Sequence, residues 1–181
     1  PVHRGVKFQY MRRLTILITC ALMLVLPASA QDEGAQKYTN ERLEYTLELP
    51  NAKWRALTRP DSVHNHTEFI YGDRSDGLLR VRKEVVDAGT TAADLSRRDH
   101  DLKLRFQPGY VEGKEEKFTG RINGVTSGYE YSGGGKAMIG RIYYLQADNR
   151  TVYVLHFTGA RSILALLRNQ TDSIARSFQL K

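Results

Sequence analysis

Residues 141–159, RIYYLQADNRTVYVLHFTG, are the most informative segment of the sequence about the fold. Residues 138–145 and 151–158 are apolar at odd and even positions alike, and Asp148-Asn149 separates the two segments. Strands that are apolar on both faces are typical of the centre of a sheet that is covered above and below. The sequence therefore predicts an antiparallel hairpin in the middle of a covered sheet.

Further strands are predicted on both sides of this hairpin. Residues 43–49 alternate between apolar and polar side chains, and residues 67–71 and 78–86 flank a polar, turn-forming segment. Residues 111–118 carry charges on both faces, which favours the edge of a sheet. Asn123-Gly124 predicts a tight hairpin turn, because both residues accept the positive φ angles of a type I′ turn. Gly133–Gly135 predicts a second hairpin connection.

Two helices are predicted, one between strands and one at the end of the chain. Thr91 and Asp94 have the spacing of a capping box, and Leu95, Leu102 and Phe106 follow as an apolar stripe. A C-terminal stripe consists of Ile163, Leu167, Ile174 and Phe178. The predicted fold class is α+β, with a twisted, mostly antiparallel sheet of about seven to eight strands sandwiched by two main helices.

The N-terminal part has the pattern of a secretory signal. Met11 and two arginines precede a short apolar run over residues 14–26, and Ala28 and Ala30 place small side chains just before Gln31. We expect a signal peptide over residues 11–30 with cleavage before Gln31, and an upstream extension outside the fold over residues 1–10. Residues 31–40 are predicted to be a flexible tether and residues 41–181 one globular domain. The expected location is periplasmic or extracellular, with membrane contact only through the leader.

Charge and cysteine content narrow the function classes. The chain has 27 basic and 20 acidic residues, a net charge of +7, but residues 1–30 hold four of the basic residues and none of the acidic ones. The remaining excess of three positive charges does not indicate a nucleic-acid partner. Cys20, the single cysteine, lies in the predicted leader. The mature chain is therefore expected to be a monomer without disulfides or thiol chemistry.

Three segments together resemble the PsbP/Mog1-like α/β/α sandwich family. They are YTLELP with Trp54 (residues 45–54), the late hairpin at 141–159, and DSIARSF at residues 172–178. The resemblance extends over residues 41–181. It implies a binding or assembly module rather than an enzyme. It assigns no site residue, because no photosystem- or GTPase-binding motif of the family matches this sequence.

Motifs for catalysis are absent, and candidates for a metal site are few. The sequence has no G-x-S-x-G motif, and Ser127 is interpreted as a small polar residue of a strand. Asp61, His64 and His66 could hold zinc or copper, although their surroundings also fit an ordinary polar loop. Asp99-His100-Asp101 is interpreted as a solvated helix face. His156 is expected to be a buried neutral imidazole, and no cofactor is expected.

Tyrosines gather on the late strands. Two interpretations of Tyr129, Tyr131, Tyr143 and Tyr144 stay open: a recognition surface, with Arg141 as a charged anchor, or packing between helix and sheet. The first functional hypothesis is an exported, non-catalytic module that recognises a protein partner in the cell envelope or outside the cell. The alternative is a carrier of a small amphipathic or lipid ligand. A hydrolase with scattered active-site residues is the least favoured.

Overall fold

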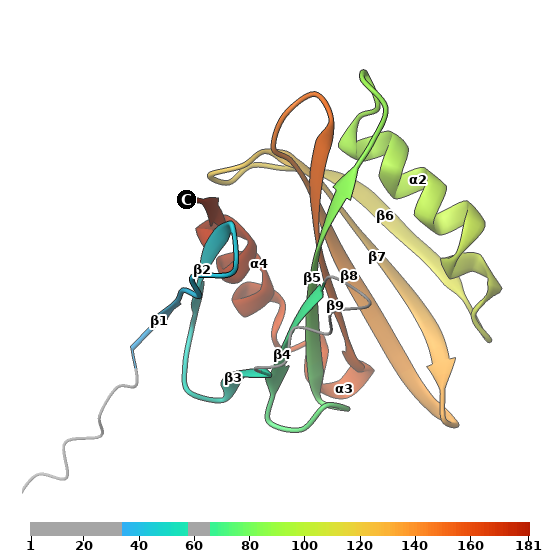
Figure 1. The fold of residues 1–181 in the computed structure, drawn as a ribbon. Helices are drawn as coiled ribbons and strands as arrows, with labels where there is room; N and C mark the ends of the chain where they lie inside the picture. The colour runs from blue at the N-terminus through green and yellow to red at the C-terminus, as the bar shows by residue number, and fades with distance from the viewer. Residues whose placement is uncertain (1–33, 58–65) are drawn as a thin grey trace, which may run out of the picture. The chain divides into compact units, whose positions relative to one another are not determined.

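A computed structural model describes residues 34–57 and 66–181 of the chain (Figure 1). All of these residues belong to one compact unit, Glu33–Lys181. The predicted extension (1–10), signal peptide (11–30) and cleavage residues Ala28, Ala30 and Gln31 lie outside the described residues. Asp61 and His64 lie outside them as well.

The main sheet has seven antiparallel strands. In sheet order they are β3 (Trp54–Leu57), β4 (His66–Tyr71), β5 (Gly77–Val85), β9 (Thr151–Ala160), β8 (Lys136–Gln146), β7 (Gly124–Gly133) and β6 (Val111–Phe118). The predicted hairpin forms strands β8 and β9 at the centre, and the charged segment forms the edge strand β6. Both predictions are confirmed.

A second sheet of three strands includes part of the predicted tether. β1 (Gln36–Tyr38) and β10 (Gln179–Leu180) both pair antiparallel with β2 (Tyr45–Leu49). The prediction of a flexible tether is therefore wrong for residues 36–38. The ring of Tyr38 packs edge-on against the ring of Phe69, with 4.8 Å between centroids. This buried aromatic contact and the β-ladder together hold the segment against the fold.

Helix α2 (Ala92–Leu102) begins where the sequence predicts. Thr91 Oγ1 accepts a hydrogen bond from the backbone N–H of Asp94, and the backbone N–H of Thr91 donates to the Asp94 carboxylate, which completes the capping box. The predicted apolar stripe is wrong after Leu95, because Leu102 and Phe106 are 65% and 74% exposed. Phe106 belongs to a short 3-10 helix, η1 (Leu104–Phe106).

The C-terminal helix is divided in two. α3 (Arg161–Leu164) and α4 (Arg168–Ser177) are separated by residues 165–167, whereas the sequence predicted one continuous stripe. Phe178 follows α4 in an extended conformation and is fully buried. Of the predicted stripe, Leu167, Ile174 and Phe178 are buried in the core and Ile163 packs against it partly buried.

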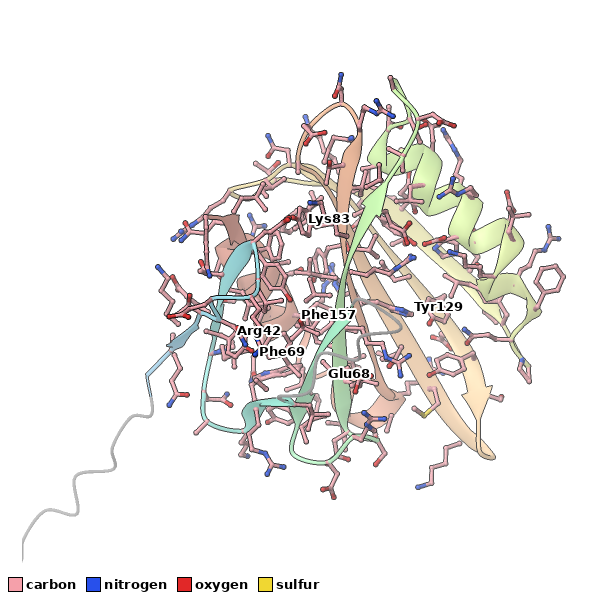
Figure 2. All side chains as sticks on the ribbon, in the orientation of Figure 1. Arg42, Glu68, Phe69, Lys83, Tyr129 and Phe157 are labelled. Carbon is pink, nitrogen blue, oxygen red and sulfur yellow. The ribbon has the colours of Figure 1, made fainter. Side chains whose placement is uncertain are left out.

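The main sheet separates two clusters of buried side chains. One cluster joins β2 and α4 to Leu155 and Phe157 of β9, and the other joins α2 to Val154 of β9. Figure 1 shows α4 with β2 on one side of the sheet and α2 on the other. In Figure 2, Phe69 and Phe157 point to the α4 side and Tyr129 lies on the α2 side. The α+β class is confirmed. One face of the main sheet is covered by both β2 and α4.

Of the two predicted glycine turns, the one at Gly133–Gly135 forms and the one at Asn123-Gly124 does not. Gly134 and Gly135 have φ angles of +58° and +74° and form a two-residue turn between β7 and β8. Asn123-Gly124 does not form the predicted type I′ turn. Gly124 begins β7 instead, where a Cβ atom would stand 1.8 Å from the carbonyl oxygen of Tyr144. Close approach of two backbones explains this glycine.

Candidate functional site

The predicted tyrosine surface does not form. Tyr143 and Tyr144 are fully buried and Tyr129 is 3% exposed. Adjacent residues of a strand point to opposite faces, so Tyr144 packs on the α2 side and Tyr143 on the α4 side. The half-buried Arg141 donates from Nε to the Tyr143 hydroxyl at 2.6 Å. The packing interpretation therefore holds for Tyr143 and Tyr144, whose rings are fully buried, while Tyr129 and the partly exposed Tyr131 line the pocket described next.

A pocket of about 410 Å³ lies on the α2 side of the sheet. Its walls come from β5, β7, β9 and the loop that follows η1. Its size falls within the range of roughly 300–1,000 Å³ that is typical of ligand sites. We call it the Tyr129–His156 pocket, and its polar lining is mainly Arg80, Gln107, Tyr129, Tyr131, His156 and Thr158.

A glycine in the central strand β8 makes this pocket possible. Gly140 lies opposite Tyr129 in the β7–β8 ladder, and a Cβ at residue 140 would stand 2.0 Å from Cε1 of the Tyr129 ring. The ring therefore lies across β8, where a side chain would otherwise be. It reaches β9, where the Tyr129 hydroxyl and Nε2 of His156 are 2.8 Å apart.

The Tyr129–His156 pair is uncharged at neutral pH. Burial, followed by the positive charges of Arg82 and Arg80, lowers the pKa of His156 to about 3. Burial also raises the pKa of Tyr129. A phenol therefore meets a neutral imidazole, and one of the two groups donates to the other in the hydrogen bond between them. His156 is hydrogen-bonded as predicted, but the residue is partly exposed and not fully buried.

Gln107 forms part of the wall of the pocket. Its Oε1 atom is buried with no hydrogen-bond partner among the described residues. The backbone N–H of Ser132 donates to the carbonyl of Pro108 at 2.7 Å, which fixes the Gln107 loop to β7. A buried acceptor without a donor is costly unless a ligand or water supplies one.

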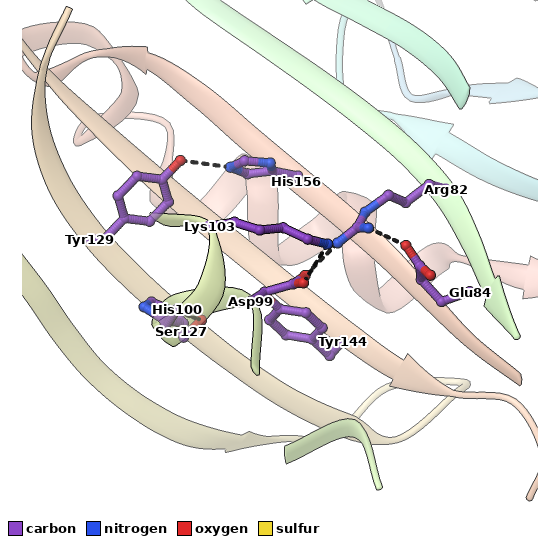
Figure 3. A network of polar contacts seen from close by, with 9 residues as sticks. All are labelled: Arg82, Glu84, Asp99, His100, Lys103, Ser127, Tyr129, Tyr144 and His156. Atoms are coloured by element: carbon purple, nitrogen blue, oxygen red, sulfur yellow. Dashed lines mark hydrogen bonds and ion pairs between the residues drawn. The ribbon is translucent and has the colours of Figure 1, made fainter. Parts of the chain in front are cut away.

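A buried carboxylate stabilises the sheet next to the pocket (Figure 3). Asp99 of α2 accepts hydrogen bonds from Arg82 of β5 and, at 2.7 Å, from Lys103. Burial raises the pKa of Asp99, but the Lys103 hydrogen bond and the charge of Arg82 outweigh it and hold this pKa below its ordinary value. Arg82 also pairs with Glu84, so the cluster balances its charges and joins α2 to the sheet.

A serine–histidine pair lies under α2. The His100 Nε2 atom is 2.9 Å from Ser127 Oγ, and its Nδ1 atom is 2.5 Å from the Tyr110 hydroxyl. Ser127 and His100 are both buried, and neither lines the Tyr129–His156 pocket. The interpretation of residues 99–101 as a solvated helix face is wrong for Asp99 and His100, which face the sheet, and correct for the exposed Asp101.

The metal candidates gain no support. His66 belongs to β4, but its side chain, like all of Asp61 and His64, lies outside what the structure describes. Within the described residues no three His, Cys, Asp or Glu side chains are grouped to hold a metal ion. None of the helices in that part of the chain is both long enough and apolar enough to cross a membrane.

Sequence reasoning missed the pocket although one signal for it was present. The two-residue turn at Gly134-Gly135 fixes the register of β7 against β8 and places Tyr129 opposite Gly140. A large aromatic residue opposite a glycine in a central strand indicates a ring that crosses the neighbouring strand. The partnership with His156 and the place of Gln107 in the same pocket depend on strands and loops far apart in the sequence, and no local pattern marks them.

Comparison with known proteins shows the fold alone. The sequence matches no protein-family model and no curated protein. Cyanobacterial PsbP from Synechocystis superposes with a TM-score of 0.54 at 13% identity, over 84% of this chain and 96% of that one. LpqN of Mycobacterium tuberculosis, involved in cell envelope biogenesis, gives 0.53 at 16% identity, over 83% and 93%. The fold is therefore PsbP/Mog1-like.

A structure from Bacteroides thetaiotaomicron gives a TM-score of 0.54 at 11% identity and covers 82% of this chain. The match covers 49% of the Bacteroides protein, so this chain spans about half of that protein's length.

Proposed function

We propose that this protein is an exported, non-catalytic binding module that recognises a protein partner at the Tyr129–His156 pocket. The observation that carries the proposal is the pocket of about 410 Å³ that the Tyr129 ring builds over Gly140. A glycine in a central strand loses the packing of a side chain and weakens the strand, and here it leaves room for the Tyr129 ring that forms a wall of the pocket.

The chemistry of the pocket supports binding rather than catalysis. A general base must hold a pKa near the working pH, and the pKa of His156 is about 3. Ser127 and His100 have the residue types of a nucleophile and its base, but both are buried away from the pocket. Tyr129 stays a phenol, because burial raises its pKa.

The lining supports a protein partner over an amphipathic small ligand. Carriers of such ligands enclose mainly apolar surface. This pocket is instead an open hollow on the sheet, whose exposed surface is more apolar than polar in area and includes the charged Arg80. Tyrosine and arginine are enriched where proteins meet. The carrier therefore remains the second candidate.

Export to the cell envelope is part of the proposal. The signal-like pattern over residues 11–30 supports it, and so does the similar fold of LpqN, a protein involved in cell envelope biogenesis.

Site-specific photo-crosslinking in living cells tests the proposal. The photoreactive p-benzoylphenylalanine replaces Ser132, an exposed residue at the rim of the pocket, or Lys114 on the edge strand β6. The expected result is a discrete protein adduct from position 132 and none from position 114. Equal adducts from both positions, or none from position 132, would overturn the proposal.

A further inference from the structure

We infer that the Tyr129–His156 pocket binds the carboxyl end of a peptide, a carboxylate with an amide N–H close beside it. This inference rests on the proposed function and names the chemical group that the pocket recognises. Capture of a terminal carboxylate is a recurring way of binding peptides.

Arg80 supplies the positive charge. Its Nε donates to Glu68 at 2.9 Å, and Arg74 pairs with the same glutamate. The terminal nitrogens of Arg80 make no other hydrogen bond or ion pair with the described residues, and the side chain lines the pocket while 48% exposed. A guanidinium with a free terminal fork matches the geometry of a carboxylate.

Neighbouring side chains add further donors. His156 lies directly opposite Arg80 in the β5–β9 ladder. Its neutral imidazole has one N–H and pairs through Nε2 with the Tyr129 hydroxyl. Thr158 and Tyr131 bring hydroxyl groups to the same lining. A carboxylate with its four lone pairs can accept from several of these donors at once.

Gln107 selects a carboxylate that has an N–H beside it. Its buried Oε1 lacks a donor among the described residues, and the side chain lines the pocket. The last amide nitrogen of a peptide is bonded to the Cα atom that carries the terminal carboxylate, and is two bonds from the carboxylate carbon. One peptide end therefore satisfies both Arg80 and Gln107, whereas a fatty acid or an aspartate side chain offers the carboxylate alone.

The apolar part of the lining indicates the last side chain of the peptide. Leu78, Pro108 and the ring of Tyr131 line the pocket beside the polar groups. Tyr131 is stacked on Tyr129 with 5.5 Å between centroids, which holds its ring in place. An apolar terminal residue such as leucine fits this surface.

The test uses three small probes and the purified protein, with binding followed by NMR shifts of the Thr158 and Tyr131 amides. N-acetyl-leucine carries the carboxylate and the N–H, N-acetyl-leucinamide lacks the charge, and 4-methylpentanoate lacks the N–H. The expected result is that N-acetyl-leucine binds at least tenfold more tightly than either of the others. Equal binding of the amide or of 4-methylpentanoate would overturn the inference.

Two variants link the probes to the residues. Arg80→Gln is expected to weaken N-acetyl-leucine at least tenfold, and Gln107→Ala to abolish its advantage over 4-methylpentanoate. Arg97→Gln is the matched control, because Arg97 is exposed on α2 and pairs with Asp94 instead. Unchanged binding by Arg80→Gln would contradict the inference. If no probe binds while position 132 still gives its protein adduct, the inference is wrong and the proposed function stands.

Discussion

The ring of Tyr129 lies across Gly140, so closely that a Cβ at residue 140 would stand 2.0 Å from Tyr129 Cε1. This arrangement carries the Tyr129 hydroxyl over β8 to His156 on β9. It also explains why a central strand holds a glycine, a residue that weakens strands by giving up a side chain. The aromatic ring replaces the packing that a side chain at residue 140 would have supplied.

Gly140→Ala tests this relationship. The added methyl group must displace the Tyr129 ring, so we expect a loss of about 2 kcal/mol in the free energy of unfolding. Urea denaturation measures it. Gly128→Ala is the matched control, because a Cβ there would meet only the Gly140 carbonyl at 3.7 Å, an ordinary contact. Equal losses in the two variants would show that the ring does not depend on Gly140.

Tyr129→Phe isolates the hydrogen bond to His156. It leaves the ring in place but removes the hydroxyl that hydrogen-bonds a partly buried imidazole, so we expect a loss of about 1–2 kcal/mol in unfolding free energy. Tyr131→Phe serves as the control, since the Tyr131 hydroxyl has no hydrogen bond among the described residues, and its effect should stay within about 0.5 kcal/mol. The prediction fails if the two variants unfold at the same urea concentration.

Acid should weaken the fold through His156. Its pKa is about 3 in the folded protein against an ordinary value of 6.5. Between these values the unfolded chain binds a proton that the folded chain does not. Stability therefore falls as the pH falls, by up to about 1.4 kcal/mol per pH unit from this group. NMR titration of the His156 ring should show no protonation above about pH 5, and a midpoint near 6.5 would contradict the prediction.

Asp99→Asn should loosen α2. The change leaves Arg82 and Lys103 without their buried carboxylate, at an expected cost of about 3 kcal/mol near neutral pH. The pKa of Asp99 is lowered from 3.8, so its contribution is complete above about pH 4 and disappears as the pH falls through the lower, folded-state value. The wild type should therefore approach the variant in acid.

The control for this prediction is Asp101→Asn. Asp101 is 69% exposed and stands 3.7 Å from Arg105, so its loss should change the free energy of unfolding by about 0.5 kcal/mol or less. A loss as large as that of Asp99→Asn would show that burial of the carboxylate is not the cause.

Local patterns predicted those parts of the fold that local chemistry determines. The capping box of Thr91 and Asp94 sets the start of α2, and two-sided apolarity places β8 and β9 at the centre of the sheet. Local patterns did not predict that the buried side of α2 carries polar residues. Asp99 and His100 are buried because Arg82 and Ser127 meet them from strands that are distant in sequence.

The candidate site was less predictable than the fold. Tyr129, Tyr143 and Tyr144 are polar at one end only, and sequence does not show whether such rings point to solvent or to a helix. The pairing of Tyr129 with Gly140 follows from the turn at Gly134-Gly135, once that turn is known to have two residues. To predict that Arg80 and Gln107 line the pocket requires the complete strand order, which no local pattern supplies.

Blocking the pocket tests most directly whether the protein partner is recognised there. Thr158→Trp places an indole in the pocket, and crosslinking from position 132 is then compared with and without this change. If the pocket is the recognition site, the protein adduct disappears in the Thr158→Trp background, while Lys114→Trp on the far edge strand leaves it intact. An adduct of undiminished yield in correctly folded Thr158→Trp protein would contradict recognition of the protein partner at the pocket.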